Sequence, residues 1–294
     1  MYSPINDRIK ADLDEKISAI ERRLLSDVLF FYGPIQPGLS TEFKELVADL
    51  RGGDDRHEKL SIILTTPGGS ASEVERCVNV VRNFYNEVDF IIPDFAYSAG
   101  TIFCMSGDNI FMNYFSVLGP IDPQVQNKDG AWVAALGYLD KVNEMIEKSK
   151  NDELSPAEFM ILKELDLGEL REYEQAEELT TDLLKRWLVK YKFKNWTEHR
   201  TNVKKLGKPV LEREKVQRAN DIAKQLSNNK RWKSHGRPIN METLREEIRL
   251  EIHDFSESKE LEGEVMSYYG YIDDLISKRG FSFCFHTRRR LVHG

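Results

Sequence analysis

The chain has 294 residues, of which 40% are hydrophobic and 31% charged, and its formal net charge is −7. This length can bury one large core, or a core with an accessory lobe, and the composition is that of a soluble globular protein with long surface helices. An acidic chain without a broad basic face is not expected to bind nucleic acid. The basic cluster Lys190–Lys194 is interpreted as the end of an amphipathic helix.

Cysteine and histidine usage argues against a metal or disulfide framework. The three cysteines, Cys77, Cys104 and Cys284, are widely spaced, and the six histidines show no H-x-x-x-H or H-x-H pattern. Neither a zinc site nor paired disulfides is expected, and no cofactor is predicted. Free cysteines favour a reducing compartment, which predicts a cytoplasmic location.

The first 25 residues predict an amphipathic helix. Its apolar residues run from Ile5 to Leu24 as a stripe at helical spacing, interrupted by charges, so the segment is not typical of a targeting signal. No window approaches the roughly 18 apolar residues that a membrane span needs, so no membrane association is predicted. This helix is expected to cap the core or to dock on a partner subunit.

Alternating strands and helices follow. Val28–Tyr32 predicts a strand, a helix follows through Phe43–Leu50, and Ser61–Leu64 predicts a buried strand that ends in Pro67-Gly68-Gly69. Ser70 is expected to cap the next helix, with Glu73 as its capping-box partner.

A second strand and corner repeat this pattern. Val88–Ile92 predicts a buried strand, and Tyr97-Ser98-Ala99-Gly100 opens a short helix, so Ser98 lies at a strand-to-helix corner. Asn109–Met112 predicts the next strand, which leads to the loop Gly119–Pro123.

Beyond Gly130 the sequence predicts almost continuous helix. Ser155-Pro156 combines a capping box with proline at the first helical position and starts a helical stretch to about Trp196. A helix over Val216–Leu226 and one capped by Asn240 flank the loop that carries His235. We therefore expect an N-terminal helix (1–26), an α/β core (27–150) and a mainly helical extension (151–294).

The two glycine-bearing turns predict an acyl-transfer site. A nucleophilic serine requires a tight turn with backbone N–H groups nearby, which stabilise the oxyanion where negative charge develops. Ser98 with the Pro67-Gly68-Gly69 turn supplies both parts, although a serine after a strand is also a common helix N-cap.

The order of the Pro-Gly-Gly and Ser-Ala-Gly turns along a βαβ chain resembles the Clp/crotonase superfamily, and most closely its serine dehydrogenase proteinase family. The resemblance covers about residues 27 to 125 and a patch at Trp232-Lys233-Ser234-His235. It implies an α/β fold, the Clp/crotonase-like ββα superhelix, here with a helical C-terminal extension. It also implies a serine peptidase in which Gly69, with Gly68 in the same turn, and Ala99 form the oxyanion hole.

The same resemblance suggests a Ser-His-Asp triad. The position of the Clp base is Asp122 here, and His235, in a segment that continues to Pro238-Ile239, matches the histidine of the serine dehydrogenase proteinases. Ser98 would be the nucleophile, His235 the base and Asp122 the residue that orients it. Asp122 before a proline is also a common turn initiator, and His235 could be a solvated loop histidine.

Three alternatives stay open. Lys141 could be the base of a Ser-Lys dyad, as in the related signal peptide peptidase A, if it is desolvated; the polar neighbours Asp140 and Glu144 favour a solvated lysine. The chain could instead be a crotonase-type acyl-coenzyme A enzyme or a catalytically silent assembly subunit. For the peptidase, the expected partners are a peptide or protein substrate and further copies of the chain in a homo-oligomer, and an unfoldase or adaptor partner is left open.

Overall fold

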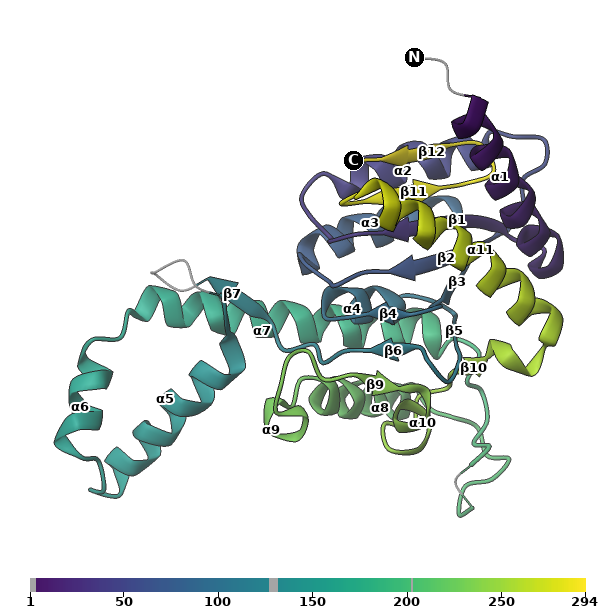
Figure 1. Ribbon diagram of the computed structural model, residues 1–294. Helices are drawn as coiled ribbons and strands as arrows, with labels where there is room; N and C mark the ends of the chain where they lie inside the picture. Colours follow the sequence, from purple (N-terminus) through teal and green to yellow (C-terminus); the bar gives the residue numbers. More distant parts are fainter. Residues whose placement is uncertain (1–3, 127–131, 202) are drawn as a thin grey trace.

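The structure, a computed structural model, describes residues 4–126, 132–201 and 203–294. A seven-stranded sheet forms its centre (Figure 1), with strand order β10-β5-β3-β2-β1-β11-β12. These strands are β1 (Asp27–Tyr32), β2 (Lys59–Thr65), β3 (Glu87–Ile91), β5 (Asn109–Met112), β10 (His253–Asp254), β11 (Cys284–His286) and β12 (Leu291–His293). The strands from β10 to β1 are parallel, and β11 and β12 extend the sheet in antiparallel pairs.

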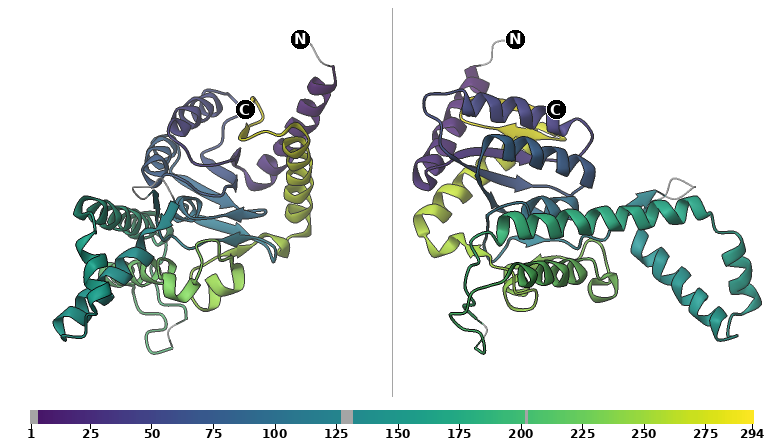
Figure 2. Two further views of the ribbon diagram at one scale, coloured as in Figure 1. Left: turned by 60° about the vertical axis from the view of Figure 1, so that its left-hand side comes forward. Right: turned by 180° about the vertical axis from the view of Figure 1, so that it is seen from behind.

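Helices cover both faces of this sheet (Figure 2). One face carries α2 (Leu39–Arg51) and α3 (Ala71–Phe84), and the other carries α1 (Pro4–Leu24) and α11 (Lys259–Arg279). Adjacent residues of β1 illustrate the division, because Phe31 packs on Phe43 of α2 and Phe30 packs on Tyr268 of α11. Burial on both faces explains why the parallel strands are nearly continuous hydrophobic runs in the sequence.

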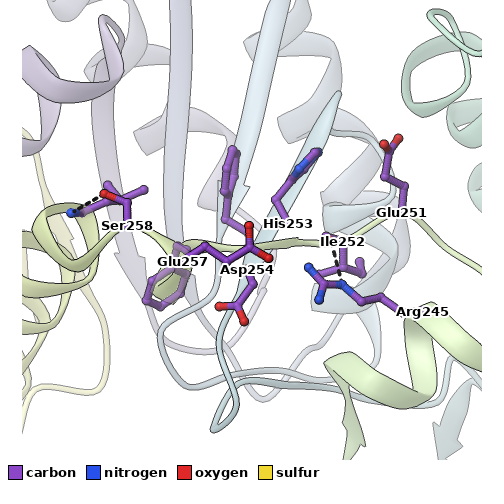
Figure 3. Close-up of a pocket in the computed structure, with 10 residues that line it drawn as sticks. Arg245, Glu251, Ile252, His253, Asp254, Glu257 and Ser258 are labelled. Carbon is purple, nitrogen blue, oxygen red and sulfur yellow. Dashed lines mark hydrogen bonds between the residues drawn. The ribbon is translucent and has the colours of Figure 1, made fainter.

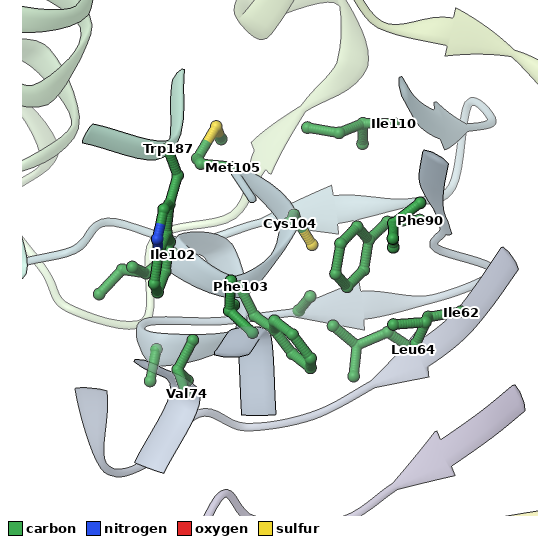
Figure 4. Close-up of a cluster of buried hydrophobic side chains, with 14 of the residues drawn as sticks. Ile62, Leu64, Val74, Phe90, Ile102, Phe103, Cys104, Met105, Ile110 and Trp187 are labelled. Atoms are coloured by element: carbon green, nitrogen blue, oxygen red, sulfur yellow. The ribbon is translucent and has the colours of Figure 1, made fainter. Parts of the chain in front are cut away.

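The short helix α4 (Ala99–Cys104) is anchored in the larger of the two cores (Figure 4). All six of its residues are buried. The Phe103 ring lies 4.9 Å from that of Phe90 and 5.7 Å from that of Phe43, measured between centroids. The helix that follows Ser98 is therefore held rigidly against the sheet.

Two small sheets lie outside the main one. β4 (Phe95–Ala96), β6 (Val117–Leu118) and β9 (Ile239–Asn240) form a three-stranded sheet in the order β4-β6-β9. β4 is parallel to β6, and β9 is antiparallel to β6. β7 (Gln124–Gln126) and β8 (Trp132–Ala134) pair in antiparallel fashion.

A helical arm projects from the core (Figure 1). It consists of α5 (Ala135–Lys150), α6 (Pro156–Lys163) and the first part of α7 (Leu167–Trp187). The predicted start of α6 is confirmed, because Ser155 forms a complete capping box with Glu158 and proline follows. The helical stretch predicted to about Trp196 is divided into separate helices. α6 ends at Lys163, and the side chain of Asp166 caps a new helix.

Further helices follow the arm in the chain. The π-helix η1 (Leu188–Lys192) continues α7, and α8 (Glu212–Leu226), α9 (Asn229–Trp232), α10 (Met241–Glu246) and the 3-10 helix η2 (Phe255–Glu257) follow. As predicted, Asn240 caps α10: its Oδ1 accepts a 2.9 Å hydrogen bond from the Thr243 N–H. The loop containing His235 thus begins and ends at anchored residues.

One capping prediction is only half right. Ser70 caps α3 by accepting a 3.2 Å hydrogen bond from the Glu73 N–H. The Glu73 carboxylate does not return to Ser70, since its Oε1 accepts a 2.7 Å hydrogen bond from the Ser40 N–H at the start of α2. Glu73 therefore joins two neighbouring helices.

The N-terminal helix behaves as its apolar stripe predicts. Leu13, Ile17 and Ile20 are fully buried against the sheet and α11, whereas the side chain of Ile5 lies outside the described part of the chain. No described helix is both long enough and apolar enough to span a membrane.

Candidate active site

The backbone at Ser98 adopts a conformation that is rare for a residue with a side chain. Its φ is +54°, in the turn that joins β4 to α4, and the residue is partly exposed. Such a conformation costs free energy and persists only where surrounding structure imposes it, often at functional sites. The buried helix α4 supplies that constraint on one side of the serine.

The Gly68-Gly69 turn supplies the constraint on the other side. Gly68 has a φ of +100°, and a Cβ there would lie 2.8 Å from the Cβ of Ser98. Gly69 has a φ of +144°, and a Cβ there would lie 2.1 Å from the carbonyl oxygen of Ile35. Only glycine fits either position, and the turn packs directly on the serine corner.

Backbone donors remain available beside Ser98. The N–H of Gly68 donates to Thr66 Oγ1 at 3.1 Å, so it is already engaged. In the described residues, no hydrogen bond engages the N–H of Gly69 or that of Ala99. An oxyanion hole requires backbone N–H donors that are not already engaged.

The structure brings His235 and Asp122 together. His235 Nδ1 lies 2.9 Å from Asp122 Oδ1, and the side chains are 27% and 3% exposed. Because Nδ1 faces the carboxylate, the opposite ring nitrogen, Nε2, is left to accept a proton. The sequence offers both residues as candidates, and this pairing is the geometry that makes a histidine an oriented base.

The pairing of β6 with β9 brings together segments whose residues are 113 positions apart. β6 and β9 are antiparallel, with Leu118 opposite Ile239. Beyond this pair, the segments that carry Asp122 and His235 both lie at the same end of the small sheet, outside the strands. The loop of His235 is further held by Trp232, whose Nε1 donates to the Gln225 carbonyl at 2.8 Å.

Ser98 emerges at the same edge of the small sheet. β4 lies parallel to β6 with Ala96 opposite Leu118, so Ser98 and the Gly119–Asp122 loop leave the sheet in the same direction. A Cβ on Gly119 would lie 3.3 Å from the Ser98 backbone nitrogen, which shows how closely the two turns pack. In the described chain no hydrogen bond joins the Ser98 hydroxyl to His235, and such bonds are often long before substrate binds.

Two buried threonines, which belong to no motif of the sequence, hold these turns in place. Thr101 is fully buried, and its Oγ1 accepts a 2.9 Å hydrogen bond from the Gly119 N–H. The same oxygen lies 2.8 Å from the carbonyl oxygen of Ala96 and 2.9 Å from the carbonyl oxygen of Gly119, to either of which it can donate. Thr66 is also fully buried and accepts from Gly68. In the sequence, the feature that indicates such a residue is a hydroxyl side chain within an otherwise apolar segment, as in Gly100-Thr101-Ile102-Phe103.

Lys141 lies in a different setting. It stands on α5 in the projecting arm with its side chain 58% exposed, and its Nζ forms an ion pair with Glu144 Oε1 at 3.1 Å. A lysine becomes a base when burial disfavours its charge. Lys141 lacks that desolvation here.

The hollow in Figure 3 belongs to another part of the molecule. It has a volume of about 550 Å³ and lies at the β10 edge of the main sheet, where His253, Asp254 and Glu251 contribute side chains. Arg245 lines it too, and its Nε donates to the Ile252 carbonyl at 2.9 Å. Ser98, Asp122 and His235 are not among its lining residues.

Comparison with known proteins identifies the architecture. Residues 44–205, which are more than half of the chain, match the family model described as ClpP-like SDH-type serine proteinase. Two uncharacterized proteins of Methanocaldococcus jannaschii are 28% and 27% identical to this chain over 126 and 92 residues. The first alignment covers 43% of this chain and 38% of the relative, and the second covers 31% of this chain and 32% of the relative. The match therefore spans about a third of the length of these relatives.

A solved structure of a membrane-bound stomatin-specific protease in complex with a substrate peptide was also found. It is 20% identical, with a TM-score of 0.32, over 42% of this chain and 58% of that one.

Proposed function

Since this chain belongs to the family of ClpP-like SDH-type serine proteinases, we propose that it is a serine peptidase in which Ser98 is the nucleophile, His235 the general base and Asp122 the residue that orients it. The observation that carries this proposal is the 2.9 Å contact between His235 Nδ1 and the buried Asp122 carboxylate. A histidine oriented in this way, on the sheet edge where a strained serine emerges, is suited to acyl transfer.

The reaction follows from these atoms. His235 Nε2 accepts the proton of the Ser98 hydroxyl as its Oγ attacks the carbonyl carbon of the scissile peptide bond. Asp122 stabilises the imidazolium that forms, and His235 then gives the proton to the leaving amine. Water, activated by the same histidine, hydrolyses the acyl-enzyme and restores the serine.

The oxyanion of each tetrahedral intermediate would bind the N–H groups of Gly69 and Ala99. Both lack other hydrogen-bond partners in the described residues, whereas Gly68 already donates to Thr66. We therefore assign Gly68 a steric role, in which the missing side chain lets the turn approach Ser98. Backbone donors that are fixed before substrate arrives require no reorganisation during the reaction.

The Ser-Lys dyad is the second candidate mechanism. The exposure of Lys141 and its ion pair with Glu144 favour His235 over it. A crotonase-type activity and a silent assembly subunit predict no reactive serine, so the same experiment addresses both. We also propose a peptide or protein as substrate, a cytoplasmic location consistent with three free, buried cysteines, and a homo-oligomeric state.

Labelling with a fluorophosphonate probe tests the proposal. We expect the wild-type protein to be labelled at Ser98 and to hydrolyse an unstructured protein such as casein, and Ser98→Ala to lose both properties while keeping its circular dichroism spectrum. Ser234→Ala is the matched control, because Ser234 is an exposed serine next to His235. Labelling retained in Ser98→Ala would remove Ser98 from the mechanism.

A further inference from the structure

The segment that carries His235 is strongly basic. Residues 229–240 contain Lys230, Arg231, Lys233 and Arg237 and no acidic residue. The whole chain has a net charge of −7, so this local excess of positive charge is opposite in sign to the molecule. Interactions between exposed charges fade beyond about 8 to 10 Å at ordinary ionic strength, so a ligand beside His235 would sense this segment more than the distant charges.

Two of the four basic side chains have an acidic partner, and the other two have none in the part of the chain that the structure describes. Lys230 Nζ lies 3.6 Å from Asp140 Oδ2, and Arg231 Nη2 lies 2.5 Å from Glu247 Oε2. Lys233 and Arg237 are both exposed, and neither side chain has a hydrogen bond or ion pair within the described residues. The two cations that have no partner among the described residues stand two positions before and two positions after His235.

The backbone at Lys233 adds an independent observation. Lys233 has a φ of +64° as the C-cap of α9, a left-handed conformation in which glycine is usual. A lysine at such a position carries conformational strain that glycine would relieve. No ion pair within the described residues engages its side chain.

We propose that Lys233 and Arg237 bind a carboxylate of the substrate, so that the enzyme prefers acidic peptides whose Asp or Glu lies near the scissile bond. This inference rests on the proposed role of His235, because only a substrate held at that residue comes close to both cations. Arg237 offers a planar set of N–H donors that matches a carboxylate, and Lys233 offers a mobile point charge.

Paired peptides measure the preference directly. Fluorogenic peptides that differ only by Glu or Gln, at each position on either side of the cleaved bond, are compared by kcat/KM. Because exposed ion pairs are individually weak, we expect Glu to be favoured roughly three- to ten-fold at the best position. We expect the ratio to fall toward one in 1 M salt, where the screening length is about 3 Å.

The double variant Lys233→Gln/Arg237→Gln should bring the Glu-to-Gln ratio of kcat/KM close to one. Lys259→Gln is the control, because Lys259 is an exposed lysine at the start of α11 on the opposite face of the main sheet. A Glu-to-Gln ratio near one in the wild-type enzyme, or an undiminished ratio in the double variant, would overturn the proposal.

Failure of the proposed peptidase activity can be distinguished from failure of the proposed substrate preference alone. A wild-type protein that hydrolyses none of the peptides and is not labelled by fluorophosphonate would contradict the proposed peptidase, and the substrate preference with it. If the double variant instead changes the mass measured by light scattering and the Glu preference is unaltered, the two cations serve a contact between copies of the chain, which also overturns the proposal.

Discussion

At the scale of single residues, the buried Asp122 carboxylate allows a sharp test of the proposed triad. Asp122→Asn keeps the shape of the side chain but offers His235 Nδ1 an amide that can hold the ring in the wrong tautomer. We expect kcat to fall by roughly 10³- to 10⁴-fold while the fold survives, measured by peptide hydrolysis and circular dichroism. A loss smaller than ten-fold would mean that Asp122 does not orient the base.

The choice of base is decided by a pair of variants. His235→Ala should lower kcat by several orders of magnitude, because no other group then accepts the Ser98 proton. Lys141→Ala should change it by less than a factor of a few, since its side chain is 58% exposed and paired with Glu144. The reverse ranking of kcat would give the role of base to Lys141.

Thr101 should matter for stability as well as for activity. Thr101→Val removes the hydroxyl that accepts from the Gly119 N–H and leaves that buried donor without a partner. We expect a loss of about 1 to 3 kcal/mol in the free energy of unfolding, measured by urea titration, and a lower kcat. Thr101→Ser, which keeps the hydroxyl, is the matched control; equal losses in both variants would show that the methyl group is what counts.

Part of the candidate site could be predicted residue by residue. Gly68, Gly69 and Ser98 carry local signals, because turns that need glycine and a serine at a corner are visible within a few positions. The contact of His235 with Asp122 depends on the pairing of β6 with β9, two strands far apart in the chain, and a single sequence does not determine such a pairing. The motif resemblance, rather than periodicity, is what pointed to His235.

At the scale of elements, long periodic segments were predictable and short ones were not. The strands β1, β2, β3 and β5 and the helices α1, α3 and α8 follow the apolar patterns of the sequence closely. β4, β6 and β9 have two residues each, which is too short to show an alternating pattern, yet they assemble the candidate site. The addition of β10, β11 and β12 to the main sheet also went unforeseen, because tertiary pairing defines those strands.

Three elements meet at a buried histidine, which predicts acid sensitivity. His286 of β11 is fully buried, with Nε2 3.0 Å from Asp14 Oδ1 of α1 and Nδ1 2.9 Å from the Tyr268 hydroxyl of α11. Burial lowers the pKa of His286 below its usual 6.5. Burial also tends to raise the pKa of Asp14, but hydrogen bonds from His286 and Lys10 outweigh this and lower it.

Proton linkage gives the direction in which stability changes with pH. The unfolded chain binds protons at His286 and Asp14 more readily than the folded chain, so stability falls as pH drops below about 6.5 and falls further below about 4. The slope from one such group is at most about 1.4 kcal/mol per pH unit. We expect His286→Gln to reduce the slope between pH 6.5 and 5 in urea titrations, and the exposed-residue variant His293→Gln to retain it. An unchanged slope in His286→Gln would contradict the prediction.

At the scale of the whole molecule, the projecting arm supports the proposed homo-oligomer. α6 buries no residue, and Phe159, Met160 and Ile161 are 57%, 56% and 55% exposed. Contiguous exposed apolar side chains are typical of an interaction surface. We expect light scattering at micromolar concentration to give a mass well above 34.1 kDa, with cyclic symmetry as the simplest closed arrangement.

Phe159→Glu/Ile161→Glu should lower that mass toward the monomer. Val203→Glu, at an apolar residue that is 89% exposed outside the arm, is the control and should leave the mass unchanged. A wild-type mass of 34.1 kDa would contradict the oligomer itself, and a wild-type oligomer that is insensitive to the arm variant would move its interface elsewhere.

The three-stranded sheet β4-β6-β9 is completed late in the synthesis of the chain. Its first two strands are complete by residue 118, but its third, at Ile239–Asn240, is made only about 120 residues later. Under the proposed triad, a growing chain holds the serine and its glycine turns long before it holds the base. Cleavage would begin only when β9 joins the sheet, so the order of synthesis would delay proteolysis until most of the enzyme has been made.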